Sequence, residues 1–489
     1  MTEQRSSNGE RMSALDATFL AVEDAVTHMH IGSVGIFEGP PPRYEDMRAM
    51  VLGKLALVPH YRQVVRFVPF SVGRPVWVDD AHFNLDYHLR RTALPLPGGE
   101  QELRRLVARV MSQQLDRCKP LWEMWIVEGL DSGRWAVISK IHHCMVDGVA
   151  GTDLITVLLD RSRAAEPPAK DTWQPESGPG DVALLARALA LNVTSPADAV
   201  RSLAAPGQLL HRGRDAARGL LRMRGLVRAT PASSLNGPVG PHRRWSWARA
   251  QLSDIREVRA ALGGTVNDVV LACIAGGFRR LLISRGEPAD RVVRSLVPVS
   301  VRSPSEHGVY NNRVSAMFAD LPVDIEDPAR RLQSIRAQMV DLKDSHEAVA
   351  GEVLTSLAGF APPLLLALGE RLATRVPQSS INTVTTNVPG PQYPLYAGGR
   401  RMLESFPYVP LGGHVRVGVA IFSYDGACTF GVTGDYDAAP DVDVLSEGIE
   451  RSLAELVELA RPVAARATGS RQGASGGRAG AAPSGSPSP

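Results

Sequence analysis

The pattern of apolar and polar positions along the chain predicts short strands and longer helices in alternation. Strands are predicted where β-branched and aromatic residues crowd into short runs. Helices are predicted where apolar residues recur every three or four positions, as Leu103, Leu106, Val107 and Val110 do. The predicted strands are residues 29–37, 134–142, 292–301 and 415–422, and the predicted helices are residues 100–117, 266–284 and 442–461.

Changes of composition along the chain suggest four segments. A chain of 489 residues is longer than one hydrophobic core usually serves, so two domains are expected. The Pro/Gly-rich, polar stretch 163–180 separates them, and the last residues are mostly Gly, Ser, Pro and Ala, a composition that favours disorder. The predicted segments are an N-terminal half 1–165, a basic helical crossover 166–245, a C-terminal half 246–467 and a disordered tail 468–489.

Two stretches bear on contact with membranes. Residues 353–369 carry no charge, but Pro362 and Pro363 interrupt them, and they fall short of the roughly 20 residues of a spanning helix. A buried or substrate-facing helix pair is the main interpretation, and contact with a lipid interface is the alternative. Residues 182–230 hold eight arginines against two aspartates. That pattern fits either solvated helical faces or contact with an anionic membrane.

Composition excludes several classes of function. A formal net charge of +3 is too small to indicate a nucleic-acid-binding protein. The four cysteines form no Cys-x-x-Cys pair, and no histidine stands at zinc-ligand spacing from such a pair, so no metal site is expected. The polar N-terminus lacks an apolar run, so no signal peptide is expected, and the cysteines fit a reduced, cytoplasmic setting.

The stretch from Lys140 to Asp153 (KIHHCMVDGVAGTD) carries the candidate chemistry. A predicted strand leads into the adjacent histidines and a predicted helix follows, so His143 is expected on a loop at a strand end. Histidine titrates near neutrality and suits a general base that takes the proton of a hydroxyl. The resulting imidazolium can return that proton to a leaving thiolate, and no covalent acyl-enzyme is needed when both substrates are bound together.

The neighbours of His143 are expected to support it. His142 points to the other face of the strand, so a direct role is not favoured. Asp147 is expected to hold the loop by pairing with a basic residue elsewhere, and Gly148 permits a tight exit from the turn. The histidines and Asp147 are acceptable metal ligands, but spacing supplies no third one, so no metal is expected here.

With these motifs the sequence resembles the bacterial wax ester synthase/diacylglycerol acyltransferases. They belong to the HHxxxDG superfamily, with chloramphenicol acetyltransferase and peptide-synthetase condensation domains. Asn311 stands where the family would have Gly, a small local departure. The matching stretches run in order over about residues 12–460: SALDATFLAVE at 13–23, KPLWEMWIVEGL at 119–130, HHCMVDG at 142–148, TVND at 265–268, VPVSVR at 297–302, NNRVS at 311–315 and TNVPGP at 386–391.

The resemblance implies an α/β (α+β) fold of two chloramphenicol-acetyltransferase-like domains. Each would be a mixed sheet backed by helices, with the active site in a tunnel between them. His143 matches the family's catalytic histidine and Asp147 its structural aspartate, for which Arg302 is the best-placed partner. Three further groups are implied to line or shape the site: Pro120, Leu121 and Trp122; Asn267 and Asp268; and Thr385, Thr386 and Asn387.

Each of these groups also has a structural interpretation. Pro120, Leu121 and Trp122 fit a packed core. One of Asn267 and Asp268 fits a helix N-cap. Thr385, Thr386 and Asn387 are alternatives as donors to a tetrahedral oxyanion, a role worth several kcal/mol, and the Asn-Val-Pro-Gly-Pro stretch is also a plain turn signal.

The function implied is transfer of a long-chain acyl group from acyl-CoA to diacylglycerol. The alternatives are wax ester synthesis on long-chain alcohols, a condensation-type acyltransferase and a catalytically silent lipid-binding protein. No metal or redox cofactor is expected, because acyl-CoA is itself a substrate. Since the product is strongly apolar, a cytoplasmic protein bound peripherally to the inner membrane or to lipid droplets is expected.

Overall fold

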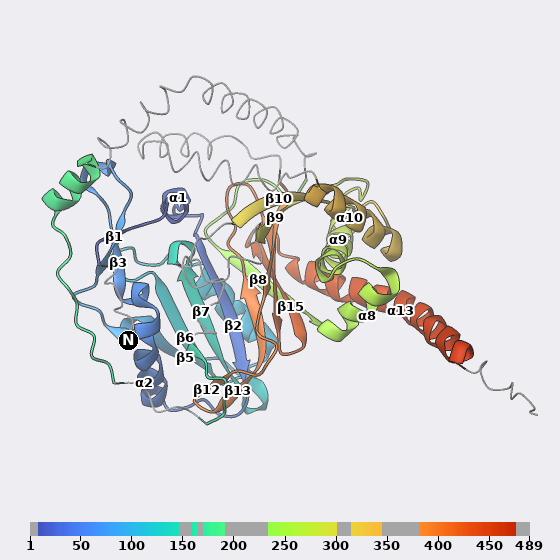
Figure 1. Cartoon of the computed structure of the whole chain (residues 1–489), viewed down its shortest axis with the longest axis horizontal. Coiled ribbons are helices and arrows are strands. Elements are labelled where there is room, and N and C mark those ends of the chain that lie inside the picture. Colours follow the sequence, from blue (N-terminus) through green and yellow to red (C-terminus); the bar gives the residue numbers. More distant parts are fainter. Residues whose placement is uncertain are drawn as a thin grey trace, which may run out of the picture.

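The computed structural model describes residues 8–145, 158–164, 170–190, 233–300, 314–344 and 381–475. Within these residues two six-stranded sheets stand side by side with helices packed on them, and a three-stranded sheet forms a small lobe (Figure 1). This arrangement confirms the predicted mixed sheets backed by helices.

The first sheet is built mainly from the N-terminal half. Its strands are β2 (His30–Phe37), β5 (Leu89–Ala93), β6 (Trp122–Glu128), β7 (Trp135–His142), β12 (Tyr396–Ala397) and β13 (Arg400–Tyr408). Their order is β12-β13-β2-β7-β6-β5, with β5 parallel to β6 and the other neighbours antiparallel. All eight residues of β7 are buried. A strand covered on both faces needs apolar side chains at most positions, which is why residues 134–142 form a nearly continuous apolar run.

The second sheet is built from the C-terminal half. Its strands are β8 (Arg243–Gln251), β9 (Val293–Ser300), β10 (Val314–Leu321), β11 (Thr383–Pro389), β14 (Val417–Tyr424) and β15 (Ala427–Asp435). Their order is β10-β9-β11-β14-β15-β8, and β11 runs parallel to both of its neighbours. The strands predicted at 292–301 and 415–422 correspond to β9 and β14.

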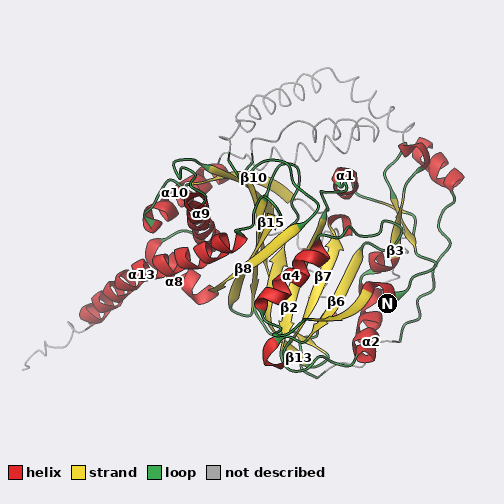
Figure 2. Cartoon of the chain, turned by 180° about the vertical axis from the view of Figure 1, so that it is seen from behind, coloured by secondary structure: helices red, strands yellow, loops and turns green. Residues whose placement is uncertain are grey.

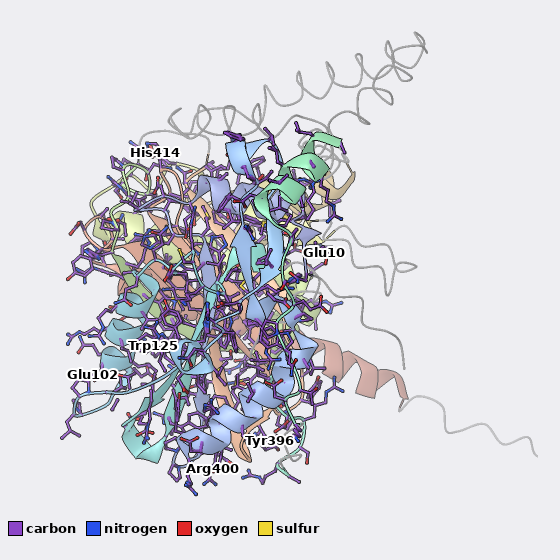
Figure 3. All side chains as sticks on the ribbon, turned by 90° about the vertical axis from the view of Figure 1, so that its left-hand side faces the viewer. Glu10, Glu102, Trp125, Tyr396, Arg400 and His414 are labelled. Carbon is purple, nitrogen blue, oxygen red and sulfur yellow. The ribbon has the colours of Figure 1, made fainter. Side chains whose placement is uncertain are left out.

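The hairpin β12–β13 crosses from the C-terminal half into the first sheet. β13 pairs antiparallel with β2, and Figure 3 labels Tyr396 and Arg400, which mark this hairpin. The hairpin also approaches the second sheet: a Cβ atom at Gly431 of β15 would lie 1.7 Å from the carbonyl oxygen of Pro407. Only glycine permits that approach. The first sheet therefore draws on both predicted halves.

Four helices accompany the second sheet (Figure 1). They are α8 (Leu252–Leu262), α9 (Val266–Ser284), α10 (Pro328–Asp344) and α13 (Val442–Ser475). α9 and α13 cross closely, because a Cβ at Gly448 would lie 2.9 Å from the Cα of Gly277. The predicted helix 266–284 matches α9. The predicted helix 442–461 begins where α13 does, but α13 runs on to Ser475, past the predicted segment boundary at 467.

The helices of the N-terminal half are shorter. They are α1 (Ala14–Val22), α2 (Tyr44–Lys54), α3 (Leu85–His88) and α4 (Glu100–Met111). The predicted apolar stripe of α4, from Leu103 to Val110, is buried, but the helix ends at Met111 instead of residue 117.

Two side chains from the first sheet contact carbonyl groups at the C-terminal end of α4. Lys140 Nζ donates to the carbonyl of Val110 at 3.0 Å, and His30 Nε2 lies 2.6 Å from the carbonyl of Met111. Lys140 is fully buried, and burial lowers the pKa of its amine to about 8. These contacts satisfy carbonyls that a helix end leaves without partners.

α4 also joins the two halves. It lies over β2 and β8 (Figure 2), and its apolar face shares one buried cluster with Trp245 and Trp247 of β8 and Phe406 of β13. Around this cluster Arg249 pairs with Glu100 at 2.6 Å and with Glu404 at 2.5 Å. Apolar contact and ion pairs thus hold the same helix to both sheets.

The small lobe lies beside the first sheet. Its strands β1 (Glu10–Arg11), β3 (Gln63–Arg66) and β4 (Val76–Asp79) pair in the order β1-β4-β3. Residues 181–190, the helical part of the predicted crossover that the structure describes, pack on it through Leu184.

Among the described residues no single helix is long and apolar enough to cross a membrane. The pair α8–α9 reaches that length and composition only when taken together, across a bend of 101°. α9 is mostly buried within the C-terminal half.

The crossing of α9 and α13 generates a stability prediction. Gly448→Ala should lower the free energy of unfolding by about 1–3 kcal/mol, because its Cβ would press on the backbone of α9. Urea denaturation measures this change. Gly180→Ala is the matched control, since a Cβ there meets nothing within 4 Å. Equal stability of the Gly448 variant and the native protein would contradict the close crossing.

Candidate active site

The two adjacent histidines stand where β7 ends. The backbone N–H of His142, the last residue of the strand, donates to the carbonyl of Leu121 at 2.9 Å. His143 opens the short turn His143–Met145, and its N–H donates to the carbonyl of Met29 at 2.8 Å. The main chain is therefore held on both sides of the pair, and His143 lies directly after the strand.

The side chain of His143 is covered by α1. Its ring stacks on Phe19 with centroids 3.9 Å apart and planes inclined by 29°. The side chain keeps part of its surface accessible, unlike the fully buried His142. Desolvation by the surrounding protein lowers the pKa of His143 to about 4. The imidazole is therefore neutral near pH 7, the form that a general base requires.

A buried carboxylate lies behind the histidines. Glu23, the residue that ends α1, accepts hydrogen bonds from Arg117 Nε at 2.9 Å and Nη2 at 2.6 Å, and from the N–H of Met29 at 3.3 Å. His142 Nε2 lies 3.6 Å from the same carboxylate. Burial raises the pKa of Glu23, but the proximity of His142 and Arg117 to the carboxylate outweighs it and lowers the pKa to about 2.

These contacts give His142 a structural task. Its Nδ1 accepts from the N–H of Cys144 at 3.2 Å. That bond requires a bare Nδ1, which places the ring proton on Nε2, facing Glu23. His142 thus ties the turn that carries His143 to α1.

Pro120, Leu121 and Trp122 lie at the start of β6. All three are buried, and the indole N–H of Trp122 donates to the carbonyl of Tyr61 at 2.8 Å. The carbonyl of Leu121 is the acceptor for His142, as described above. Their contacts therefore fit the core-packing interpretation, and Leu121 also supports the backbone of His142.

Asn267 and Asp268 have different contacts at the start of α9. Asp268 forms a capping box with Thr265: its carboxylate accepts from the N–H of Thr265 at 2.7 Å, and its own N–H donates to the Thr265 hydroxyl at 3.2 Å. Asn267 Oδ1 instead accepts from Asn387 Nδ2 at 3.3 Å. The N-cap of α9 is thus Thr265, and Asp268 supports it as the third helical residue of the capping box, so neither Asn267 nor Asp268 is the N-cap that the sequence suggested. Asn267 meets Asn387.

The two threonines of β11 face different surroundings. Thr385 is buried, and its hydroxyl accepts from Ser295 at 2.7 Å. Thr386 is only partly buried, as is Asn387. The hydrogen bonds of Thr385, Asn387 and Asn267 all run within the C-terminal half.

Three predicted site residues, Asp147, Gly148 and Arg302, lie outside the described residues. The pairing of Asp147 with Arg302 and the tunnel between the halves therefore stay predictions. A described cavity of about 970 Å³ lies elsewhere, between α9, α10 and α13, and none of the predicted site residues lines it.

Sequence reasoning assigned no role to Phe19, Glu23 or Arg117. Phe19 and Glu23 belong to the stretch 13–23 that matches the family, so a comparison of motifs could have pointed to them as candidates. Their contacts with His143 and Arg117 span about a hundred residues of chain, and no local pattern reports such contacts.

Comparison with known protein families gave two matches. The model of the wax ester synthase/diacylglycerol acyltransferase catalytic domain matches residues 12–270, and that of the WS/DGAT C-terminal domain matches residues 310–457. A curated relative, the probable diacylglycerol O-acyltransferase tgs1 of Mycobacterium tuberculosis, is 38% identical over 453 residues. The alignment covers 92% of this chain and 96% of the relative.

Solved structures support the same comparison. The wax ester synthase/diacylglycerol acyltransferase from Marinobacter aquaeolei VT8 aligns with a TM-score of 0.65 and 26% identity, over 92% of this chain and 99% of that one. The first condensation domain of the CDA synthetase aligns with a TM-score of 0.55 and 18% identity, over 92% and 96% of the two chains. The second match bears on the fold alone, and together they confirm the predicted two-domain fold.

The cover over His143 generates a prediction about pH. Since the base must be unprotonated, kcat/KM for the native protein should fall only as the pH approaches 4, where His143 gains its proton. Phe19→Ala admits water to the ring and should move the acidic limb up towards the ordinary histidine pKa of about 6.5. Phe19→Leu keeps an apolar cover and should leave the limb near its native position.

Thiol release followed across pH measures these limbs, with circular dichroism at each pH to confirm that the protein stays folded. A native limb already near pH 6.5 would show that His143 is not desolvated as described.

The buried carboxylate generates a second prediction. Glu23→Gln removes the charge that Arg117 and His142 face, and should cost about 1.5–3 kcal/mol of stability together with a loss of turnover. Urea denaturation and kcat measure the two effects. Glu128→Gln is the control: Glu128 pairs with the exposed Arg91, and such a pair contributes about 0–1 kcal/mol. If both variants behaved alike, Glu23 would have no special part in placing the turn.

Proposed function

The chain belongs to the wax ester synthase/diacylglycerol acyltransferase family, and we propose that it transfers the acyl group of a long-chain acyl-CoA to the free hydroxyl of diacylglycerol. It is an acyltransferase, and the product of the proposed reaction is triacylglycerol. The observation that carries the proposal is the position of His143, directly after β7, where the carbonyl of Met29 holds its backbone and Phe19 covers its ring.

The proposed mechanism uses His143 alone for proton transfer. Its neutral imidazole takes the proton of the acceptor hydroxyl while that oxygen attacks the thioester carbonyl. When the tetrahedral intermediate collapses, the C–S bond breaks and the imidazolium returns the proton to the CoA thiolate. His143 takes up one proton and returns it within the same reaction. The proposal therefore requires no metal, no redox cofactor and no covalent acyl-enzyme.

Other residues are proposed to hold this base in place. Glu23, His142 and Arg117 fix the turn through the contacts described above. Asp147 is proposed to hold the loop after His143 by pairing with Arg302. Asn267 and Asn387 meet through their side chains, and we propose that this pair shapes the acceptor side of the site.

The choice of acceptor rests on the relatives. The mycobacterial relative, at 38% identity, is named for diacylglycerol, which supports that acceptor. The matching family model and the Marinobacter structure are named for wax ester synthesis as well, so long-chain alcohol is the second candidate. A condensation-type reaction has only the fold in its support.

The proposed substrates also bear on location. Diacylglycerol and its acylated product reside in membranes and lipid droplets. We therefore propose a cytoplasmic protein that binds peripherally to the inner membrane or to droplets.

Thiol release from palmitoyl-CoA tests the proposal. The purified protein should release CoA faster with diacylglycerol, and to a lesser degree with hexadecanol, than with no acceptor. His143→Ala should lower the acceptor-dependent rate by about 10²–10⁴-fold. His82→Ala, which alters an exposed histidine, should leave the rate unchanged.

Thermal melting shows whether each variant is folded. A folded His143 variant with native activity, or release that no acceptor accelerates, would contradict the proposed reaction. Release driven by amine acceptors instead would favour the condensation-type alternative.

A further inference from the structure

The lobe of β1, β3 and β4 exposes an unusual group of apolar side chains. Phe70 is 84% exposed, Val182 83%, Phe67 52% and Leu189 48%. The first and third follow β3, and the others belong to the helix at 181–190. We call these four residues the apolar patch. Single exposed apolar residues are common on soluble proteins. Several of them grouped on one small lobe indicate an interaction surface.

Contacts within the lobe bring the two parts of the patch together. Arg66, next to Phe67, pairs with Asp181, next to Val182, at 2.8 Å. A Cβ at Gly73 would lie 3.0 Å from the Cβ of Ala188. The helix at 181–190 therefore lies along the segment that follows β3. The contacts run from Asp181, the first residue of the helix, to Ala188, near its end.

The helix at 181–190 has apolar residues on its inner face and, besides Asp181 and Arg187, on its exposed face as well. Leu184 packs against Val76 and Val78 of β4, which accounts for its inner face. Its exposed positions include Val182, Ala183, Ala186 and Leu189. A helix that only covered a sheet would carry polar residues there.

The turn that carries Phe70 is held in an unfavourable backbone conformation. Phe70 has a φ of 58° and Ser71 a φ of 54°. Left-handed φ values are disfavoured for residues with a Cβ, and they persist where the surrounding structure imposes them. In this turn the left-handed conformation occurs at Phe70, whose aromatic ring is largely exposed.

Besides Arg66, which pairs with Asp181, three further arginines accompany the patch. Arg11, opposite Val76 in β1, and Arg74, two residues before Val76, make no ion pair among the described residues, and the charge of Arg11 adds to burial in lowering the pKa of Arg74. Arg187 is exposed, and it donates to the carbonyl of Gly9. Glu10, labelled in Figure 3, precedes Arg11 and so projects from the opposite face of the strand.

The lobe is directly connected to the active site. Only Met12 and Ser13 separate β1 from α1, whose Phe19 covers His143. The lobe and α1 lie along the same edge of the molecule in Figure 1.

We propose that this lobe docks on an anionic lipid surface, with the apolar patch entering the interface and Arg11, Arg74 and Arg187 meeting phosphate headgroups. The inference deepens the proposed function, because it names the surface that would bring the site to a lipid acceptor. Apolar insertion together with nearby cations is the combination that holds peripheral proteins on anionic bilayers.

Co-sedimentation with vesicles tests the proposal without using catalysis. The probe is vesicles of equimolar phosphatidylcholine and phosphatidylglycerol, compared with pure phosphatidylcholine. The native protein and His143→Ala should both bind, and both should prefer the anionic vesicles. The Phe67→Ser/Phe70→Ser protein should bind at least about tenfold more weakly. Arg11→Gln/Arg74→Gln should remove most of the preference for phosphatidylglycerol.

Control variants separate this effect from misfolding. Ile283→Ser changes an exposed apolar residue of the C-terminal half and should leave vesicle binding unchanged. Val182→Glu adds a charge on the open face of the helix and should weaken binding while preserving the melting temperature. Turnover of the Phe67/Phe70 variant on substrates dispersed in detergent should stay native, so loss of docking and failure of the proposed reaction are distinguishable.

Three results would overturn the proposal. One is native vesicle binding by the Phe67/Phe70 and Val182 variants. Another is the absence of vesicle binding by the native protein. The third is a dimer that the Phe67/Phe70 variant converts to a monomer in light scattering, because the patch would then join two copies of the chain.

Discussion

The burial of β7 on both faces is the constraint on which the site depends. A central strand with neighbours on both sides cannot shift without breaking two ladders, so the residue at its end has a fixed position. That residue is His142, and the carbonyl of Met29, which accepts from the N–H of His143, extends the restraint to the next position along the chain. The sheet therefore places the base.

A strand that is buried on both faces also places polar groups in the interior, and each of these groups needs a partner. An unpaired buried charge costs several kcal/mol, which the protein avoids by local pairing. Lys140 meets the carbonyls at the end of α4, and Glu23 meets Arg117 and His142. These pairs connect α1, α4 and β7 into one unit around the histidine. Replacing one partner would therefore disturb the position of the base as well as the stability of the fold.

The sequence predicted those parts of the fold that rest on short-range periodicity. α9 has the predicted bounds, and the stripe from Leu103 to Val110 is buried as expected, because the pattern of one element records which face it buries. The pairing of β13 with β2 joins residues more than 360 positions apart, which no local pattern reports. For the same reason the motif identified His143 but gave no role to Phe19. Asp268 was ambiguous in sequence, and only the contact with Thr265 separates its role in the capping box from the role of Asn267.

The hairpin β12–β13 has a consequence for how the chain is made. Synthesis proceeds from the N-terminus, and domains generally fold as units while the chain emerges. Here β2 lacks its partner on one side until residue 408 has left the ribosome, although β7 pairs with its other side long before. During that interval the nascent first sheet presents an open strand edge, the feature that invites pairing with other chains. The first sheet is therefore completed late in translation, at nearly the same time as the second.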